Sequence, residues 1–299
     1  MLRRGLFCCL LGAGLAASVV AQPRLRGFAT PEMAATALAG AVRGGDEKTL
    51  AAILGDVWPD LVPTDDEDFA LERARFLVAW DESHKVAVDG DKAVIEVGKS
   101  GWTLPIMLVK QGADWRFDVV AGVEEIVARQ IGRNELGAMQ TLLAIGDAEA
   151  EYAALDPMKT GSPVYATRLK SSPGKKDGLY WPTRAGEPES PLGAQVANSQ
   201  SDGSTPGEHY GYNFRLLYEQ GPAASGGAHG YIVNGRMIGG FAAIAWPVGY
   251  GSTGLLTFIM GYKGDVYQRD LGPQTAQRAA MITSFDPTTG WEKSDTSLP

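Results

Sequence analysis

The sequence EHYGYNFRLLYEQG at residues 208–221, followed by GGFAAIAWPVGYGSTGLLTFIMGYKGDVYQRDLG at residues 239–272, decides the fold of the second half of this chain. From Tyr210 to Tyr218, aromatic and aliphatic residues occupy every second position. A period of two is typical of a strand with one buried and one exposed face. Glycines separate the apolar runs and predict turns, including a hairpin turn at Lys263-Gly264. The region therefore predicts an antiparallel sheet.

The overall composition is that of a folded protein. The chain has 299 residues, of which 44% are hydrophobic and 21% are charged, so it can bury the cores of one large or two ordinary domains. Its formal net charge is −8. Nucleic-acid binding depends on neutralising phosphates with basic residues, so we expect no nucleic-acid partner for so acidic a chain.

Residues 1–21 have the pattern of a secretory signal peptide. Arg3 and Arg4 precede an apolar run that ends in small residues, which predicts cleavage after Ala21. A retained membrane anchor is the alternative, although the run is shorter than the ~20 apolar residues of a spanning helix. We expect an exported protein, periplasmic or secreted after cleavage, whose mature form does not span the membrane.

Removal of this segment changes the chemistry available to the mature chain. Cys8 and Cys9 are the only two cysteines, so the mature chain would have no disulfide, thiol nucleophile or cysteine metal site. Loss of Arg3 and Arg4 takes the net charge from −8 to −10.

Residues 28–121 predict an N-terminal α+β domain. Thr30-Pro31 has the pattern of a helix start, Gly44-Gly45 of its end, and Asp46 of the cap of a second helix. An acidic loop is expected at residues 65–68. Strands are expected at residues 85–88, 93–97, 102–110 and 115–120. Helices followed by a meandering sheet are typical of the α+β class.

Residues 122–299 predict a C-terminal domain with a long helix on an antiparallel sheet. Apolar positions favour a helix from about 123 to 156, which Gly132 and Gly146 weaken and Pro157 ends. Residues 171–207 are rich in Gly, Pro and Ser and predict long loops. The tail after Pro273 is expected to pack through apolar residues, namely Ile282, Phe285 and Trp291.

Short sequence blocks along the mature chain carry a family resemblance. They are Gly101-Trp102 with Pro105, Trp115 to Asp118, Glu124-Glu125, Ile131 to Leu136, Asp177 to Trp181, Ser190 to Gly193, Gly211-Tyr212, Gln220 to Pro222, Gly239 to Phe241, Ala245 to Pro247, Tyr250-Gly251, Thr257-Phe258 and Val266 to Gly272. These colinear blocks resemble the bacterial family known as domain of unknown function 2950. The resemblance implies membership of that family and no particular activity.

Two further resemblances concern shape. A helix opening at Asn134-Glu135, followed by Gly211-Tyr212 and a strand pair ending near Lys263, is similar to the globular head of type IV pilin-like proteins. That resemblance implies a helix packed on an antiparallel sheet. The apolar N-terminal helix and processing site of a pilin do not directly precede the helix here. The first half is similar to the cone-shaped nuclear transport factor 2-like fold.

Charged residues cluster where the long helix is expected, and a histidine opens the later strand region. The cluster consists of Glu124, Glu125, Arg129, Arg133, Asn134 and Glu135, to which His209 and Tyr210 are added. Carboxylates and a histidine can perform acid–base catalysis, and arginines can hold an anion. The same residues can instead join the two halves of the chain through ion pairs, and we favour this interpretation, with no catalytic residue assigned.

Other motifs predict no cofactor and no metal site. Residues 249–254 read G-x-G-x-x-G, but a dinucleotide site needs a helix after this loop, and the run LLTFIM at residues 255–260 favours a strand. The loop is therefore expected to join two strands. The three histidines, His84, His209 and His229, lack the spacing of a zinc site.

Taken together, the patterns favour an exported, non-enzymatic binding or envelope-associated module. Tyrosines and tryptophans crowd the second half and, where exposed, suit another cell-envelope protein, a peptide or a saccharide. One alternative is a periplasmic hydrolase or small-molecule enzyme that uses Glu124 or Glu125 with His209. Another is a minor pilin-like subunit.

Overall fold

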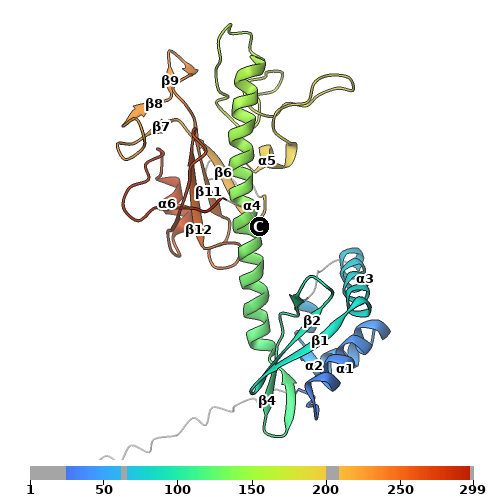
Figure 1. Ribbon diagram of the computed structural model, residues 1–299. Coiled ribbons are helices and arrows are strands. Elements are labelled where there is room, and N and C mark those ends of the chain that lie inside the picture. The colour runs from blue at the N-terminus through green and yellow to red at the C-terminus, as the bar shows by residue number, and fades with distance from the viewer. Residues whose placement is uncertain (1–24, 62–65, 200–208, 297–299) are drawn as a thin grey trace, which may run out of the picture. The chain divides into compact units, whose positions relative to one another are not determined.

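The chain forms two compact units that combine helices with antiparallel sheets. A computed structural model describes residues 25–61, 66–199 and 209–296. The first unit extends to Glu125 and the second begins at Ile126. Helices and antiparallel strands occur in both units (Figure 1), which confirms the α+β class. The signal peptide expected at residues 1–21 lies outside the described residues, and the domain division into residues 28–121 and 122–299 stays a prediction.

The first unit packs helices against a five-stranded antiparallel sheet. The strand order is β1-β2-β4-β5, with β3 paired to β2. The elements are α1 (Pro31–Gly44), α2 (Glu47–Leu54), the 3-10 helix η1 (Trp58–Leu61), α3 (Asp66–Glu82), β1 (His84–Asp89), β2 (Lys92–Val97), β3 (Trp102–Thr103), β4 (Leu108–Gln111) and β5 (Asp114–Phe117).

The expected helix signals of this unit are confirmed, and two expected strands are wrong in extent. Thr30 caps α1 and Asp46 caps α2 through their side chains. The strand expected at 102–110 is split into β3 and β4 around Pro105, which has no backbone N–H to donate to a sheet. The strand expected at 115–120 ends at Phe117, because Val119 already begins the next helix.

The acidic run expected as a loop at residues 65–68 is also corrected. Asp66, Glu67 and Asp68 form the first residues of α3, where acidic residues are favourable near a helix N-terminus. Asp65 lies outside the described residues.

The second unit packs a long helix on a five-stranded antiparallel sheet of order β14-β13-β12-β11-β6. The elements are α4 (Val119–Leu155), whose first residues belong to the first unit, α5 (Ala194–Asn198), β6 (Tyr212–Leu217), β7 (Glu219–Gln220), β8 (His229–Gly230), β9 (Ile232–Val233), β10 (Arg236–Met237), β11 (Ala242–Pro247), β12 (Leu256–Gly261), β13 (Val266–Asp270), α6 (Thr275–Ala280) and β14 (Glu292–Lys293). The helix expected at 123–156 is confirmed as one continuous helix that starts earlier. Figure 1 shows α4 alongside β6, β11 and β12.

Both faces of the central sheet are buried, so the expectation of one exposed face is wrong. Met260 on β12 lies against Gly146 of α4, which places α4 on the first face. On the second face, the Arg215 guanidinium donates hydrogen bonds to the carbonyl oxygens of Ala279 (2.9 Å) and Ile282 (2.7 Å). The chain after Pro273 therefore covers this face.

The turns of the sheet follow the glycine pattern. The G-x-G-x-x-G loop joins β11 to β12, as expected. Gly264, with φ of 81°, makes the tight turn between β12 and β13. Tyr210 is not part of β6. It lies before the strand in a left-handed turn with φ of 52°, and this conformation takes it out of the alternating pattern.

Candidate functional site

Two residues of the predicted cluster attach α4 to the loop that precedes β12. The Asn134 amide, which is buried, donates a hydrogen bond to the Thr253 carbonyl oxygen at 2.9 Å. Glu135 Oε1 accepts hydrogen bonds from the backbone N–H groups of Leu255 (2.9 Å) and Leu256 (3.1 Å). These contacts pair one backbone acceptor and two backbone donors of the loop with side chains of α4, so they position the loop.

His209 and Tyr210 lie at the same corner of the second unit. The Tyr210 ring packs on Gly137 of α4, where an added Cβ would lie only 2.7 Å from the ring. The centroids of the His209 and Tyr210 rings are 4.3 Å apart. Burial lowers the pKa of His209. The next residue, Gly211, adjoins the Asn134 amide. The structure thus brings Asn134, Glu135, His209 and Tyr210 together around one turn and one loop.

The remaining predicted residues also lie on α4. Arg133 donates a hydrogen bond to Gln130 Oε1 at 2.8 Å, and Arg129 follows one turn after Glu125. Glu124 and Glu125 are exposed and belong to the first unit, whereas His209 belongs to the second. Their use together in catalysis stays a prediction.

A buried carboxyl group that the sequence analysis did not single out lies further along α4. Glu149 has no solvent exposure, and its Oε2 accepts a hydrogen bond from the Ala166 N–H at 2.7 Å. Its Oε1 is buried without a hydrogen-bond partner among the described residues. Burial raises the pKa of Glu149 well above its ordinary value, against the opposing effect of the Ala166 hydrogen bond. Folding therefore shifts this carboxyl group toward its neutral form relative to an exposed glutamate.

Aromatic side chains surround this end of α4. The rings of Tyr152 and Trp181 meet edge to face with centroids 6.3 Å apart, and the Tyr152 hydroxyl donates to the Lys176 carbonyl oxygen at 2.5 Å. Burial, together with the charge of Glu149, raises the pKa of Tyr152 to about 12. Trp181 Nε1 is buried and without a partner within the described part of the chain.

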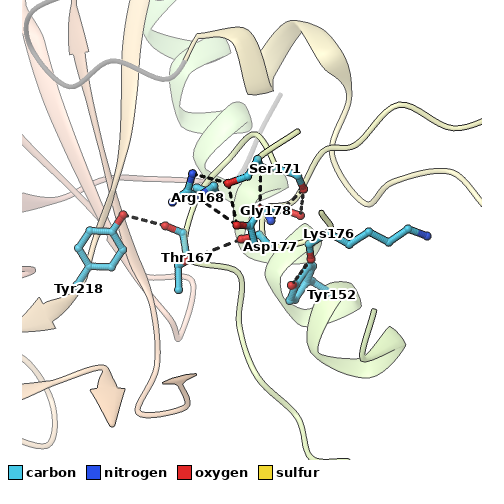
Figure 2. Close-up of polar contacts among 9 residues, drawn as sticks. Tyr152, Thr167, Arg168, Ser171, Lys176, Asp177, Gly178 and Tyr218 are labelled. Carbon is cyan, nitrogen blue, oxygen red and sulfur yellow. Dashed lines mark hydrogen bonds and ion pairs between the residues drawn. The ribbon is translucent and has the colours of Figure 1, made fainter. Parts of the chain in front are cut away.

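A polar network fixes the loop between these aromatics (Figure 2). Asp177 accepts hydrogen bonds from the Ser172 N–H (2.7 Å) and hydroxyl (2.9 Å), and it pairs with Arg168 at 4.0 Å. Burial works to raise the pKa of Asp177, but the Ser172 hydrogen bonds outweigh it and the pKa is lowered. On the other side, the Tyr218 hydroxyl donates to the Thr167 carbonyl oxygen at 2.8 Å. The loop is therefore bound to both α4 and the sheet.

An exposed hairpin adjoins this loop. Strands β9 and β10 are joined by Asn234-Gly235, whose φ angles of 51° and 75° fit a type I′ turn. Buried Tyr231 and Met237 anchor the hairpin, and the Met237 carbonyl oxygen accepts a hydrogen bond from the Tyr165 N–H at 2.8 Å. Three of its exposed side chains are aliphatic, with exposed fractions of 45% for Ile232, 44% for Val233 and 48% for Ile238, which directly follows β10.

The chain next to the hairpin is basic. Residues 157–176, the basic segment, contain no Asp or Glu and carry five cationic residues, namely Lys159, Arg168, Lys170, Lys175 and Lys176. All five are exposed. Arg236 of the hairpin donates to the Ser162 hydroxyl at 2.5 Å, which links the two elements. We refer to the β9–β10 hairpin and the basic segment together as the hairpin–segment surface.

The comparison with protein families establishes what class of protein this is. The family model described as "Protein of unknown function (DUF2950)" matches residues 25–294, so the chain belongs to this family. This confirms the resemblance found in the sequence blocks. No curated protein and no solved structure matches the chain, so the similarity to pilin heads and to the nuclear transport factor 2-like fold stays a prediction.

The described residues contain neither a membrane-spanning helix nor a metal-binding cluster. None of the helices in these residues has the length and apolar character needed to cross a bilayer. Within the same ranges, no three side chains of His, Cys, Asp or Glu gather where they could hold a metal ion.

Sequence reasoning missed Glu149, although its spacing carries a signal. Leu142, Ile145 and Tyr152 are buried on α4, and Glu149 falls between them with alternating steps of three and four residues. Such spacing places all four on one face of a helix. A glutamate in that register predicts a buried carboxyl group. The basic segment also has a signal in the sequence, because residues 157–176 contain no acidic residue.

Proposed function

We propose that the chain is an exported, non-enzymatic binding module of the cell envelope and that its partner docks on the hairpin–segment surface. The observation that carries this proposal is the exposed aliphatic hairpin. Ile232, Val233 and Ile238 point outward from a short turn that two buried anchors hold in place. Contiguous exposed apolar residues rimmed by polar ones are typical of interaction sites.

The geometry around Glu149 supports a non-enzymatic role. A catalytic acid or base must come within hydrogen-bonding reach of its substrate. Glu149, which has the strongly raised pKa expected of such a group, is fully buried and bonded to Ala166. Its hydrogen bond joins α4 to Ala166 within the basic segment, so its role in this proposal is structural.

Export is tested by expressing the full chain in a bacterium that has a periplasm and measuring the mass of the product. We expect loss of residues 1–21 and recovery of the processed chain from the envelope fraction. Full-length chain in the cytoplasm would contradict export.

Docking is tested by fractionating cells that express the double variant Ile232→Ser/Val233→Ser. Because these side chains are exposed, the variant should fold but should move from the envelope fraction to the soluble fraction. Met281→Ser is the matched control, since Met281 has an exposed fraction of 73% and lies after α6 rather than on the hairpin. Equal envelope retention of the double variant and the control would rule out this surface as the docking site.

The two alternatives have separate tests. Hydrolysis of an ester, peptide or glycoside by the purified chain, lost on His209→Ala and on Glu124→Gln/Glu125→Gln, would favour the enzyme. Concentration-dependent self-association in sedimentation velocity would favour the pilin-like subunit, and a monomer over a wide concentration range would exclude it.

A further inference from the structure

We infer that the partner of the hairpin–segment surface is the anionic face of a lipid bilayer. This inference rests on the proposed function, because it names the chemistry of the partner for the same surface. Four features of the second unit lead to it.

The first feature is the segregation of charge. The chain as a whole has a net charge of −8, yet residues 157–176 contain five cationic and no acidic residues. Positive and negative charges that alternate along a surface cancel one another within a Debye length of about 10 Å, whereas a run of charges of one sign produces a local field. The basic segment therefore attracts anions although the protein is acidic.

The second feature is the engagement of the two acidic residues that border the segment. Asp156 accepts hydrogen bonds from the N–H groups of Thr160 (2.7 Å) and Gly161 (2.8 Å). At the other end, Asp177 is bonded to Ser172 and paired with Arg168. Both carboxylates are thus held by their own loops, and neither forms an ion pair with Lys175 or Lys176 in the contacts that the structure shows.

The third feature is the presentation of the lysines. The Lys175 N–H donates to the Ser172 carbonyl oxygen at 2.9 Å, and Gly174 has φ of 73°, which makes a tight turn with an exposed tip. The Lys176 ammonium group lies 4.9 Å from the centre of the Trp181 ring. Compact ammonium groups on a turn can contact phosphates at any lateral position of a leaflet, whereas a protein partner needs acidic groups matched to each lysine.

The fourth feature is apolar surface at the same end of the unit. Leu155 and Met158, at and beyond the end of α4, are exposed, as are the aliphatic residues of the hairpin. Figure 1 shows β9 and the C-terminal end of α4 at the same end of the second unit. Binding at a membrane surface combines insertion of apolar side chains with attraction of basic residues to anionic lipids. Both components are present on this surface.

The test is cosedimentation of the processed, exported chain with lipid vesicles. One set of vesicles contains about one third phosphatidylglycerol in phosphatidylcholine, and the other contains phosphatidylcholine alone. We expect binding to the anionic vesicles that weakens as salt rises. Each lysine near an anionic surface changes affinity about fivefold, so Lys175→Gln/Lys176→Gln should weaken binding by roughly twenty-five- to thirtyfold.

The matched control is Lys92→Gln/Lys110→Gln, which removes the same charge from exposed positions of the first unit. This control should bind like the unmodified chain, and circular dichroism should show that both variants are folded. Equal binding to the two kinds of vesicle, equal binding of the two double variants, or binding to soluble polyglutamate in place of vesicles would each overturn the inference.

Failure of this inference is distinguishable from failure of the proposed function. If Ile232→Ser/Val233→Ser abolishes envelope retention in cells while the purified chain does not bind anionic vesicles, the partner is not a lipid surface and only the lipid inference fails. If the hairpin variant is retained in the envelope like its control, the proposed docking surface itself fails.

Discussion

The most decisive perturbation of the second unit is Glu149→Gln. Glutamine has the shape of the neutral glutamic acid and keeps an oxygen to accept the hydrogen bond from Ala166. It cannot ionise. The substitution therefore isolates the energetic effect of titrating a carboxyl group that the fold buries completely.

The direction in which stability changes with pH follows from proton linkage. Burial raises the pKa of Glu149 above its ordinary value of 4.5, so above that pH the folded state binds more protons than the unfolded state. Stability from this group is fully present below about pH 4.5 and is lost as pH rises toward the folded pKa. The loss amounts to about 1.4 kcal/mol for each pH unit in that window.

The measurement is urea unfolding of the unmodified chain and of Glu149→Gln from pH 4.5 to pH 7.5. The difference between their free energies of unfolding cancels the titration of all other groups. We expect nearly equal free energies of unfolding at the acidic end and an advantage for Glu149→Gln that grows by at most about 1.4 kcal/mol per pH unit until the pH reaches the folded pKa of Glu149. A difference that stays constant across the range would refute a raised pKa for the buried Glu149.

Three further predictions concern contacts of the same unit. Glu135→Ala removes the acceptor of two backbone N–H groups before β12 and should lower the free energy of unfolding by about 1–3 kcal/mol in urea titrations; an unchanged midpoint would contradict this. Gly254→Ala forces a Cβ against the Tyr212 hydroxyl and should destabilise by about 1–3 kcal/mol. Its control Gly132→Ala, with open space around the added Cβ, should stabilise α4 by about 0.5–1 kcal/mol in the same assay. Asp177→Asn should loosen the Ser172 amide in hydrogen exchange at neutral pH. Because the pKa of Asp177 is lowered from 3.8, the difference from the unmodified chain should persist at pH 3.8 and disappear only at lower pH; equal exchange at neutral pH would count against the network.

Local signals in the sequence predicted much of the secondary structure. Thr30 and Asp46 cap helices with their own side chains, and Gly264 tolerates the positive φ of a tight turn because it has no side chain, so these capping and turn roles are confirmed. The predicted strand through residues 102–110 is wrong because a proline interrupts pairing with the neighbouring strand. The predicted exposed face of β6 is wrong because burial depends on the distant residues after Pro273.

The candidate cluster also combines residues that are local in the sequence with contacts to distant residues. Asn134 and Glu135 are neighbours on one helix, but their partners Thr253 and Leu255 are more than a hundred residues away, so no local pattern reveals the contact. His209 and Tyr210 join them because a left-handed turn places the Tyr210 ring on Gly137. The predicted functional role of the cluster remains a prediction.

The sequence by itself determined the family, the α+β class, and the alternating pattern from Tyr210 to Tyr218 that identifies β6. These depend on local periodicity and on residues quoted directly from the chain. Only the tertiary structure decided that β6 is buried on both faces, that Glu149 is enclosed, and that the hairpin remains exposed beside the basic segment. Burial and pKa depend on which distant segments exclude water from a side chain, and that packing is a property of the whole fold.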